Sequence, residues 1–387
     1  MQTSVFSDTK NHFEILDGLR GVAAITIVVF HVFETFNGGN HQSQIINHGY
    51  LAVDFFFLLS GFVIGYAYDD RWNKMSLKDF FKRRLIRLHP MIVMGMTIGA
   101  IAFYFSASPN VFPHINEVPV GKLILVMLIG YTLLPVPTSM DIRGWQEMHP
   151  LDGPAWSLFF EYVANILYAL FIRRFSNTLL AVFVFISGVA LIHFSVTTLH
   201  TIYYDGVQCL GGDVIGGWSL TPEQLRIGIT RLLYPFFAGL LLSRIYKPMR
   251  INHAFIWCSL LTLVFLSIPR LGDNNSLWMN GLYDSLTIVF VFPFIVFLGA
   301  SGEVKGKIMN KICKFFGDIS YPIYIIHYPL IYIYTAWVVD NKPSVSQAWL
   351  GGTVLFAASV TIAYASLKLY DIPVRKWLTH RFLSKSK

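Results

Sequence analysis

The chain has 387 residues, of which 54% are hydrophobic and only 13% charged, and its formal net charge is +8. Average soluble domains carry about 25% charged residues, so the composition argues against a soluble protein and indicates one that lies in lipid. The basic residues flank hydrophobic runs and form no separate polar module, so the positive charge predicts membrane orientation and not nucleic-acid binding.

Long stretches without Asp, Glu, Lys or Arg recur along the chain. Most reach the roughly 18 to 20 apolar residues that cross a membrane as a helix, so we predict an all-α fold, a polytopic bundle in the bilayer. The uncharged stretches are 88–116, 123–140, 175–204, 251–269, 285–302, 319–339 and 343–367, and shorter or polar-interrupted candidates are 21–36, 50–68, 153–172 and 228–244.

The beginning of the chain does not have the pattern of a cleavable signal peptide. The first apolar run begins near Gly21 and carries Arg20 and His31 where a small-residue cleavage site would stand. We therefore expect the first helix to be retained. One membrane domain is expected to fill 1–387, with no appended soluble domain. The scattered Cys residues predict neither a metal site nor a disulfide framework.

Basic residues are distributed unevenly among the loops. They crowd 71–87, whereas 37–49 contains neither Lys nor Arg. The first of these loops is therefore predicted to be cytoplasmic and the second extracytoplasmic. On this orientation, positions 42 and 205 should react with an external thiol reagent after mutation to Cys, and positions 74 and 310 should not.

The basic groups also constrain the number of crossings. Arg87 and Arg173 are both predicted to be cytoplasmic, yet three apolar segments lie between them, 88–116, 123–140 and 153–172. We therefore expect one of the first two to be re-entrant or interfacial, with about ten crossings overall and both termini cytoplasmic. Backbone that does not cross is tolerated at membrane depth only where protein or water satisfies it, so this region is a candidate cavity wall.

Arg20 and His31 lie eleven residues apart on the first predicted helix. That spacing is close to three turns, so they share one face about 16 Å apart. His31 then lies near mid-membrane, where an ionisable group needs a cavity or a partner. The pattern indicates either an anion anchor below a reactive group, or an interfacial Arg paired with Asp17 and a His bonded within the bundle.

Arg84 and Arg87 are three residues apart and share one helical face at the cytoplasmic boundary. A pair of guanidinium groups can bind phosphate through bidentate, charge-assisted hydrogen bonds. The alternative is that the pair only anchors the orientation of the helix.

Two carboxylates occur inside predicted membrane helices, Asp54 and Glu161. Each is expected to meet a cation, a hydroxyl or water. Arg231, near the start of its own segment, is an obvious partner for one of them. Asp284 and His327 belong to the same class of intramembrane ionisable residues.

Ordered motifs run along nearly the whole chain: Leu16–Gly21 with His31, Val53–Phe56 with Ser60–Phe62, Arg84–Arg87, Trp156–Ser157 with Glu161, Arg231 with Pro235–Gly239, and Gly317–Pro322 with His327. In this order they resemble the type-three membrane acyltransferases. That family moves acyl groups from cytoplasmic CoA thioesters, usually onto extracytoplasmic glycans. One departure is Asp371 before Ile372-Pro373, where the family often has Glu.

The resemblance implies a membrane O-acyltransferase of a bacterial inner (plasma) membrane. Acyl-CoA, with acetyl the commonest acyl group in the family, would be a co-substrate, and no tightly bound cofactor or metal is expected. The acceptor would be a carbohydrate or another hydroxyl compound. A transporter or flippase of a lipid-linked or small-molecule substrate is the alternative, although we find no paired repeat halves of the kind many transporters have.

The resemblance also suggests roles for individual residues. Arg84 and Arg87, with Arg20, would hold the CoA phosphates, and Arg231 is a further candidate for donor binding. His31 would act as the base or as a transient acyl carrier. Glu161 or Asp54 would orient His31 or balance Arg231, and the sequence leaves that choice open.

Overall fold

The computed structural model describes residues 12–40, 44–197, 200–204, 207–272 and 276–383, so positions 42 and 205 lie outside the described residues. It confirms the predicted all-α membrane bundle, to which one antiparallel hairpin is added, β1 (His200–Tyr204) with β2 (Val207–Gly211). The helices are α1 (Glu14–Phe36), α2 (Ala52–Tyr68), α3 (Leu77–Ala102), α4 (Val120–Tyr131), α5 (Ala155–Leu170), α6 (Asn177–Thr197), α7 (Pro222–Ile245), α8 (Ala254–Ser267), α9 (Trp278–Leu286), α10 (Phe292–Ser301), α11 (Lys307–Asn341), α12 (Val345–Ser366) and α13 (Ile372–Phe382).

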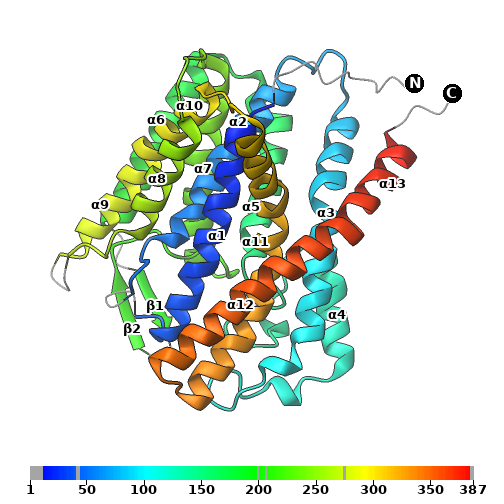
Figure 1. Ribbon diagram of the computed structural model, residues 1–387, viewed down its shortest axis with the longest axis vertical. Coiled ribbons are helices and arrows are strands. Elements are labelled where there is room, and N and C mark those ends of the chain that lie inside the picture. Colours follow the sequence, from blue (N-terminus) through cyan, green and yellow to red (C-terminus); the bar gives the residue numbers. More distant parts are fainter. Residues whose placement is uncertain (1–11, 41–43, 198–199, 205–206, 273–275, 384–387) are drawn as a thin grey trace.

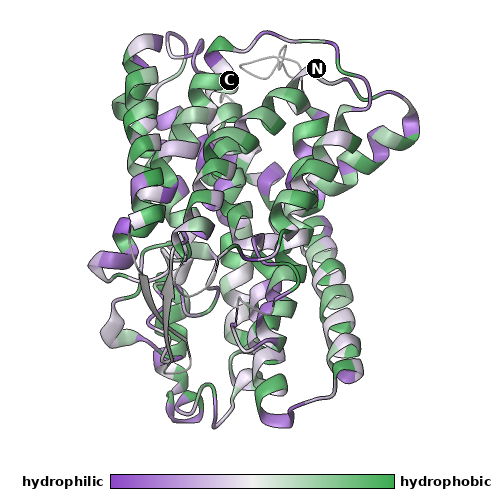
Figure 2. Ribbon diagram, turned by 90° about the vertical axis from the view of Figure 1, so that its left-hand side faces the viewer, coloured by the Kyte–Doolittle hydropathy of each residue, from purple (hydrophilic) through white to green (hydrophobic). Residues whose placement is uncertain are grey.

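Most helices run along the long axis of the molecule (Figure 1). The first turn of α1 and the end of α13 lie at one end, here called the basic end, and the β1–β2 hairpin lies toward the other, the distal end. Hydrophobic residues cover the helices, and hydrophilic residues gather in the loops at both ends (Figure 2). This distribution is the one that a bilayer-spanning bundle requires.

Among the described residues, eight helices are long and apolar enough to cross a membrane, counting α9–α10 and α12–α13 as one each. α4, α5 and α8 are apolar but shorter. The predicted total of about ten crossings therefore stays a prediction.

One of the segments 88–116 and 123–140 was expected to be re-entrant, and α4, which overlaps the second, is the shorter helix. It has 12 residues, about 18 Å of helix, against the ~30 Å of a hydrocarbon core. After it the chain turns back, because Lys122 in the first turn of α4 donates to the backbone oxygen of Asp141 at 3.2 Å. α3, in contrast, has 26 residues. α4 is therefore the shorter candidate, and which of the two segments fails to cross stays a prediction.

Two pairs of helices pack unusually closely through glycine. A Cβ at Gly21 of α1 would lie 2.3 Å from the backbone oxygen of Phe316 in α11. A Cβ at Gly61 of α2 would lie 1.8 Å from the backbone oxygen of Phe236 in α7. Small residues allow such backbone approach in membrane bundles. The motifs around these glycines therefore fix how α1 meets α11 and how α2 meets α7.

Candidate active site

A cleft of about 700 Å³, a volume that includes its open mouth, lies between α1, α2, α3, α5 and α11. Three guanidinium groups line it, from Arg20, Arg84 and Arg87. The structure thus brings together three of the four cationic residues that the sequence suggested for donor binding. The cleft is also lined by residues of the motifs around Ser60, Ser157, Glu161 and Tyr321.

Glu161 holds Arg84 in this cleft. Its Oε1 accepts hydrogen bonds from Arg84 Nη2 at 2.6 Å and from Ser60 Oγ at 2.7 Å. Arg84 is only 5% exposed, so its charge needs this partner. The structure thus assigns Glu161 to an arginine and not to His31.

The other two guanidinium groups are more open. Arg87 is exposed, and among the described residues no hydrogen bond or ion pair engages its guanidinium. Arg20 lies 3.6 Å from Asp17, the ion pair expected at that spacing. Even with Glu161 beside Arg84 and Asp17 beside Arg20, the three cations leave the cleft positive, which favours an anionic ligand.

His31 lies beyond the inner end of the cleft and has a carboxylate of its own. Its Nδ1 is 2.7 Å from Oε2 of Glu34, one turn further along α1. A carboxylate only accepts hydrogen bonds when ionised, so Nδ1 donates and Nε2 keeps its lone pair. The suggestion that Asp54 or Glu161 orients His31 is therefore wrong; Glu34 occupies that position. The i,i+3 spacing of His31 and Glu34 was the signal that could have found it.

A second histidine connects His31 to the cleft. The ring of His327 in α11 stacks on that of His31, with centroids 5.5 Å apart. His327 Nδ1 donates to the backbone oxygen of Ile323 at 3.0 Å. The Tyr324 ring, which lines the cleft, lies 6.0 Å from the His327 ring. A line of rings on α11 thus leads from the cleft to His31.

Asp54 and Arg231 form a buried ion pair away from His31. Arg231 Nη2 lies 2.6 Å from Asp54 Oδ2, and the side chains are 2% and 0% exposed. The same guanidinium donates to the backbone oxygens of Tyr50 and Gly216. All three of its nitrogens are therefore engaged, and Arg231 does not line the cleft. Its suggested partnership with an intramembrane carboxylate is found, but the geometry gives it no access to a donor in the cleft.

Comparisons with known proteins identify the family. A family model described as an acyltransferase domain, of the type-three acyltransferases, matches residues 13–368. The chain belongs to this family. The match favours the acyltransferase interpretation over the transporter alternative, and it covers every motif that lines the cleft.

Curated relatives of this acyltransferase carry related names. O-acetyltransferase OatA of Staphylococcus aureus is 25% identical over 96% of this chain. Protein 2 in the picA locus of Rhizobium radiobacter is 37% identical over 41% of this chain and 81% of its own length. A putative O-acetyltransferase of S. aureus is 22% identical over 93% of this chain. The chain spans 59% of the length of OatA. No solved structure matches this acyltransferase.

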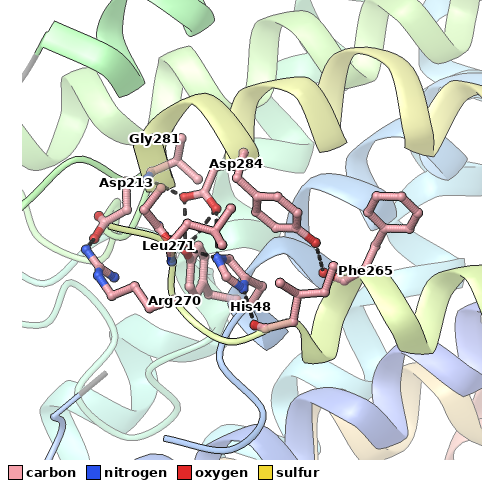
Figure 3. Close-up of polar contacts among 12 residues, drawn as sticks. His48, Asp213, Phe265, Arg270, Leu271, Gly281 and Asp284 are labelled. Atoms are coloured by element: carbon pink, nitrogen blue, oxygen red, sulfur yellow. Dashed lines mark hydrogen bonds and ion pairs between the residues drawn. The ribbon is translucent and has the colours of Figure 1, made fainter. Parts of the chain in front are cut away.

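A separate polar cluster fixes the distal loops of the acyltransferase (Figure 3). His48 Nε2 lies 2.9 Å from Asn280 Oδ1, and Tyr50 donates to Asp284 at 2.9 Å. Arg270 pairs with Asp213 at 2.7 Å. Burial lowers the pKa of His48 to about 4, and its Nδ1 lies 2.7 Å from the backbone oxygen of Ile268. Asp284, expected to need a partner, meets a hydroxyl, and the cluster ties three loops to α9.

Proposed function

We propose that this acyltransferase moves an acyl group, acetyl in the simplest case, from cytoplasmic acyl-CoA to a hydroxyl group of an extracytoplasmic glycan or related acceptor. The observation that carries the proposal is the gathering of Arg20, Arg84 and Arg87 in one cleft that points along α11 toward His31. The names of two relatives, O-acetyltransferases, support acetyl as the group transferred.

In this proposal the cleft receives the anionic part of the donor. Arg87 is open to bind phosphate, Arg20 lies in the same cleft beside Asp17, and Arg84 is held by Glu161 at the cleft wall. Guanidinium groups suit phosphate because they donate two parallel hydrogen bonds. The thioester arm would extend past Tyr324 toward His327 and His31.

The reaction then uses the dyad of His31 and Glu34. The acceptor oxygen attacks the thioester carbonyl, so that a C–O bond forms and the C–S bond breaks. His31 Nε2 takes the hydroxyl proton and returns it to the sulfur of the leaving CoA. Glu34 holds the Nδ1 proton and stabilises the imidazolium that forms meanwhile.

The orientation follows from charge. The basic end of the bundle, with the cleft mouth, would face the cytoplasm of a bacterium, and the distal end would face outward across the plasma membrane. A cytoplasmic donor and an external acceptor would meet near His31.

The test is release of CoA by the purified protein in nanodiscs, with acetyl-CoA and a panel of hydroxyl acceptors. Acceptor-dependent release is expected from the wild type, and His31→Ala should reduce it by about 10² to 10⁴. A His31→Ala variant that keeps more than a tenth of the wild-type rate would remove His31 from the mechanism. A wild type that releases no CoA with any acceptor would overturn the function.

A further inference from the structure

The chain between α4 and α5 enters the bundle from the distal end and reaches toward His31. If Gly99 of α3 carried a Cβ, that atom would lie 2.1 Å from the backbone oxygen of Leu151. A Cβ on Gly95, one turn earlier, would lie 3.1 Å from Asp152 Oδ2. The same Cβ on Gly95 would lie 2.3 Å from the side chain of Ile325 in α11. The segment 141–153, here called the inner loop, is therefore wedged between α3 and α11.

Arg143 anchors the outer part of the inner loop. Its Nε donates to the backbone oxygen of Pro150 at 2.6 Å, and its Nη1 donates to Ser106 at 2.9 Å. The guanidinium lies 3.6 Å above the ring of Tyr332 in α11, a cation–π contact. The hydroxyl of Tyr332 donates in turn to Glu147 at 2.6 Å. These bonds give the inner loop one fixed conformation.

Only the Tyr328 ring separates Gly153 of the inner loop from His31 among the contacts of the described residues. A Cβ at Gly153 would lie 2.7 Å from Glu147 Oε1, 2.7 Å from the Tyr328 ring and 3.0 Å from the Tyr332 hydroxyl. The same Tyr328 ring meets that of His31 edge to face, 5.0 Å between centroids. The Tyr328 ring therefore borders both His31 and the position of Gly153, which lies beside Glu147.

Several polar atoms of the inner loop are buried without a partner among the described residues. Both carboxyl oxygens of Asp152, which is 0% exposed, make no hydrogen bond. Both ring nitrogens of His149, 1% exposed, are also without one. Each such group costs about 1–3 kcal/mol, and native proteins contain few of them. A polar partner that reached these groups would therefore be bound favourably.

The protonation of these groups identifies the chemistry that they would bind. Burial raises the pKa of Asp152 well above its usual range and that of Glu147 to about 7, and it lowers the pKa of His149 to about 3. Burial thus favours the uncharged form of each group, and an uncharged carboxyl or imidazole can both donate and accept a hydrogen bond. Their natural complement is a neutral hydroxyl, which also does both.

Aromatic surface lies at the outer edge of the inner loop. Trp145 is half-buried, and its ring lies 4.7 Å from that of Phe112 and 6.0 Å from that of Tyr332. A sugar presents hydroxyl groups at its edge and an apolar face of C–H groups, so it suits a site with both polar groups and an aromatic plane.

We propose that the inner loop is the acceptor subsite, and that it binds a saccharide whose hydroxyls meet Glu147 and Asp152 while a sugar face lies on Trp145. This inference rests on the proposed function and deepens it. The site would hold the acceptor hydroxyl on the distal side of His31, opposite the side from which the donor arrives.

The experiment measures saccharide binding separately from transfer. Chitotriose and cellotriose are titrated onto the full-length protein in nanodiscs by saturation-transfer NMR, and CoA binding is measured by calorimetry. The variants are Glu147→Gln and Asp152→Asn, which keep side-chain shape. Glu117→Gln is the matched control, because Glu117 is 73% exposed and paired with His114 outside the inner loop.

The wild type and Glu117→Gln are expected to bind at least one trisaccharide, and the two inner-loop variants should bind it at least tenfold more weakly. All four proteins should bind CoA within twofold of one another, which also shows that the variants are folded. The proposal is overturned if the inner-loop variants bind saccharide as the wild type does, or if the wild type binds CoA and neither trisaccharide. If the wild type does not bind CoA, the proposed function is contradicted instead.

Discussion

Glu34 Oε2 accepts a hydrogen bond from His31 Nδ1 at 2.7 Å, within a single helix. The two side chains are 13% and 14% exposed, so the contact is partly shielded from water and stronger than a surface pair. Because both residues belong to α1, the dyad does not depend on the packing of a second element. The only imidazole nitrogen left for chemistry is Nε2.

Glu34→Gln is expected to lower kcat by about 10²-fold, because the amide stabilises the imidazolium less well and can select the wrong tautomer. The affinity for CoA should not change, since Glu34 does not line the cleft. Steady-state kinetics with acetyl-CoA and calorimetry with CoA separate the two quantities, and Glu34→Asp should recover part of the rate. Wild-type kcat in Glu34→Gln would show that the dyad has no catalytic role.

Arg87→Lys is expected to weaken CoA binding by about 10-fold or more, because Lys keeps the charge but loses the bidentate geometry. Calorimetry on the purified protein measures this. Arg250→Lys is the control, since Arg250 is exposed in the loop that follows α7, outside the cleft. Equal affinity for CoA in Arg87→Lys and the wild type would mean that Arg84 and Arg87 only anchor the orientation of the helix in the membrane.

Asp54→Asn is expected to destabilise the protein by about 3–5 kcal/mol, because it leaves the buried Arg231 without its counter-charge. Thermal unfolding in detergent should show a much lower Tm than for Glu117→Gln. The result that would contradict this assignment is an unchanged Tm with weaker CoA binding, because it would make Arg231 a donor-binding residue after all.

The buried carboxyl of Glu147 should make stability depend on pH. Burial raises its pKa from 4.5 to about 7, so stability is fully present below pH 4.5 and is lost as the pH rises through 7. Glu147→Gln should therefore have the same Tm as the wild type at pH 4 and a Tm a few degrees higher at pH 8.5. The measurement is thermal unfolding at both pH values. A difference between the two proteins that does not vary with pH would contradict the raised pKa.

Periodicity and charge predicted most of the fold. The uncharged stretches predicted membrane helices. The re-entrant element expected between Arg87 and Arg173 stays a prediction, for which the 12-residue α4 is the shorter candidate. The extent of the inner loop could not be predicted, because it is held by contacts with α3 and α11 that are distant in sequence. Its residues Arg143 and Glu147 stand in no helical pattern that would mark them as buried.

The site was predicted where helical spacing sufficed. Arg84 and Arg87 share the cleft with Arg20 because i,i+3 neighbours on α3 face α1. The partners of Glu161 and Asp54 required knowledge of which helices touch, and sequence gives no such distances. The i,i+3 spacing alone could have predicted that Glu34 orients His31. That role was instead given to Asp54 or Glu161, which lie deeper in the predicted helices.

We expect acyl groups to pass from a donor on one side of the membrane to an acceptor on the other through the site at His31. Sealed proteoliposomes with chitotriose trapped inside and radiolabelled acetyl-CoA added outside test it directly. We predict labelled trisaccharide inside vesicles that contain the wild type and none with His31→Ala. Label that appears only when donor and acceptor share one compartment, or equally with His31→Ala, would contradict transfer across the membrane through His31.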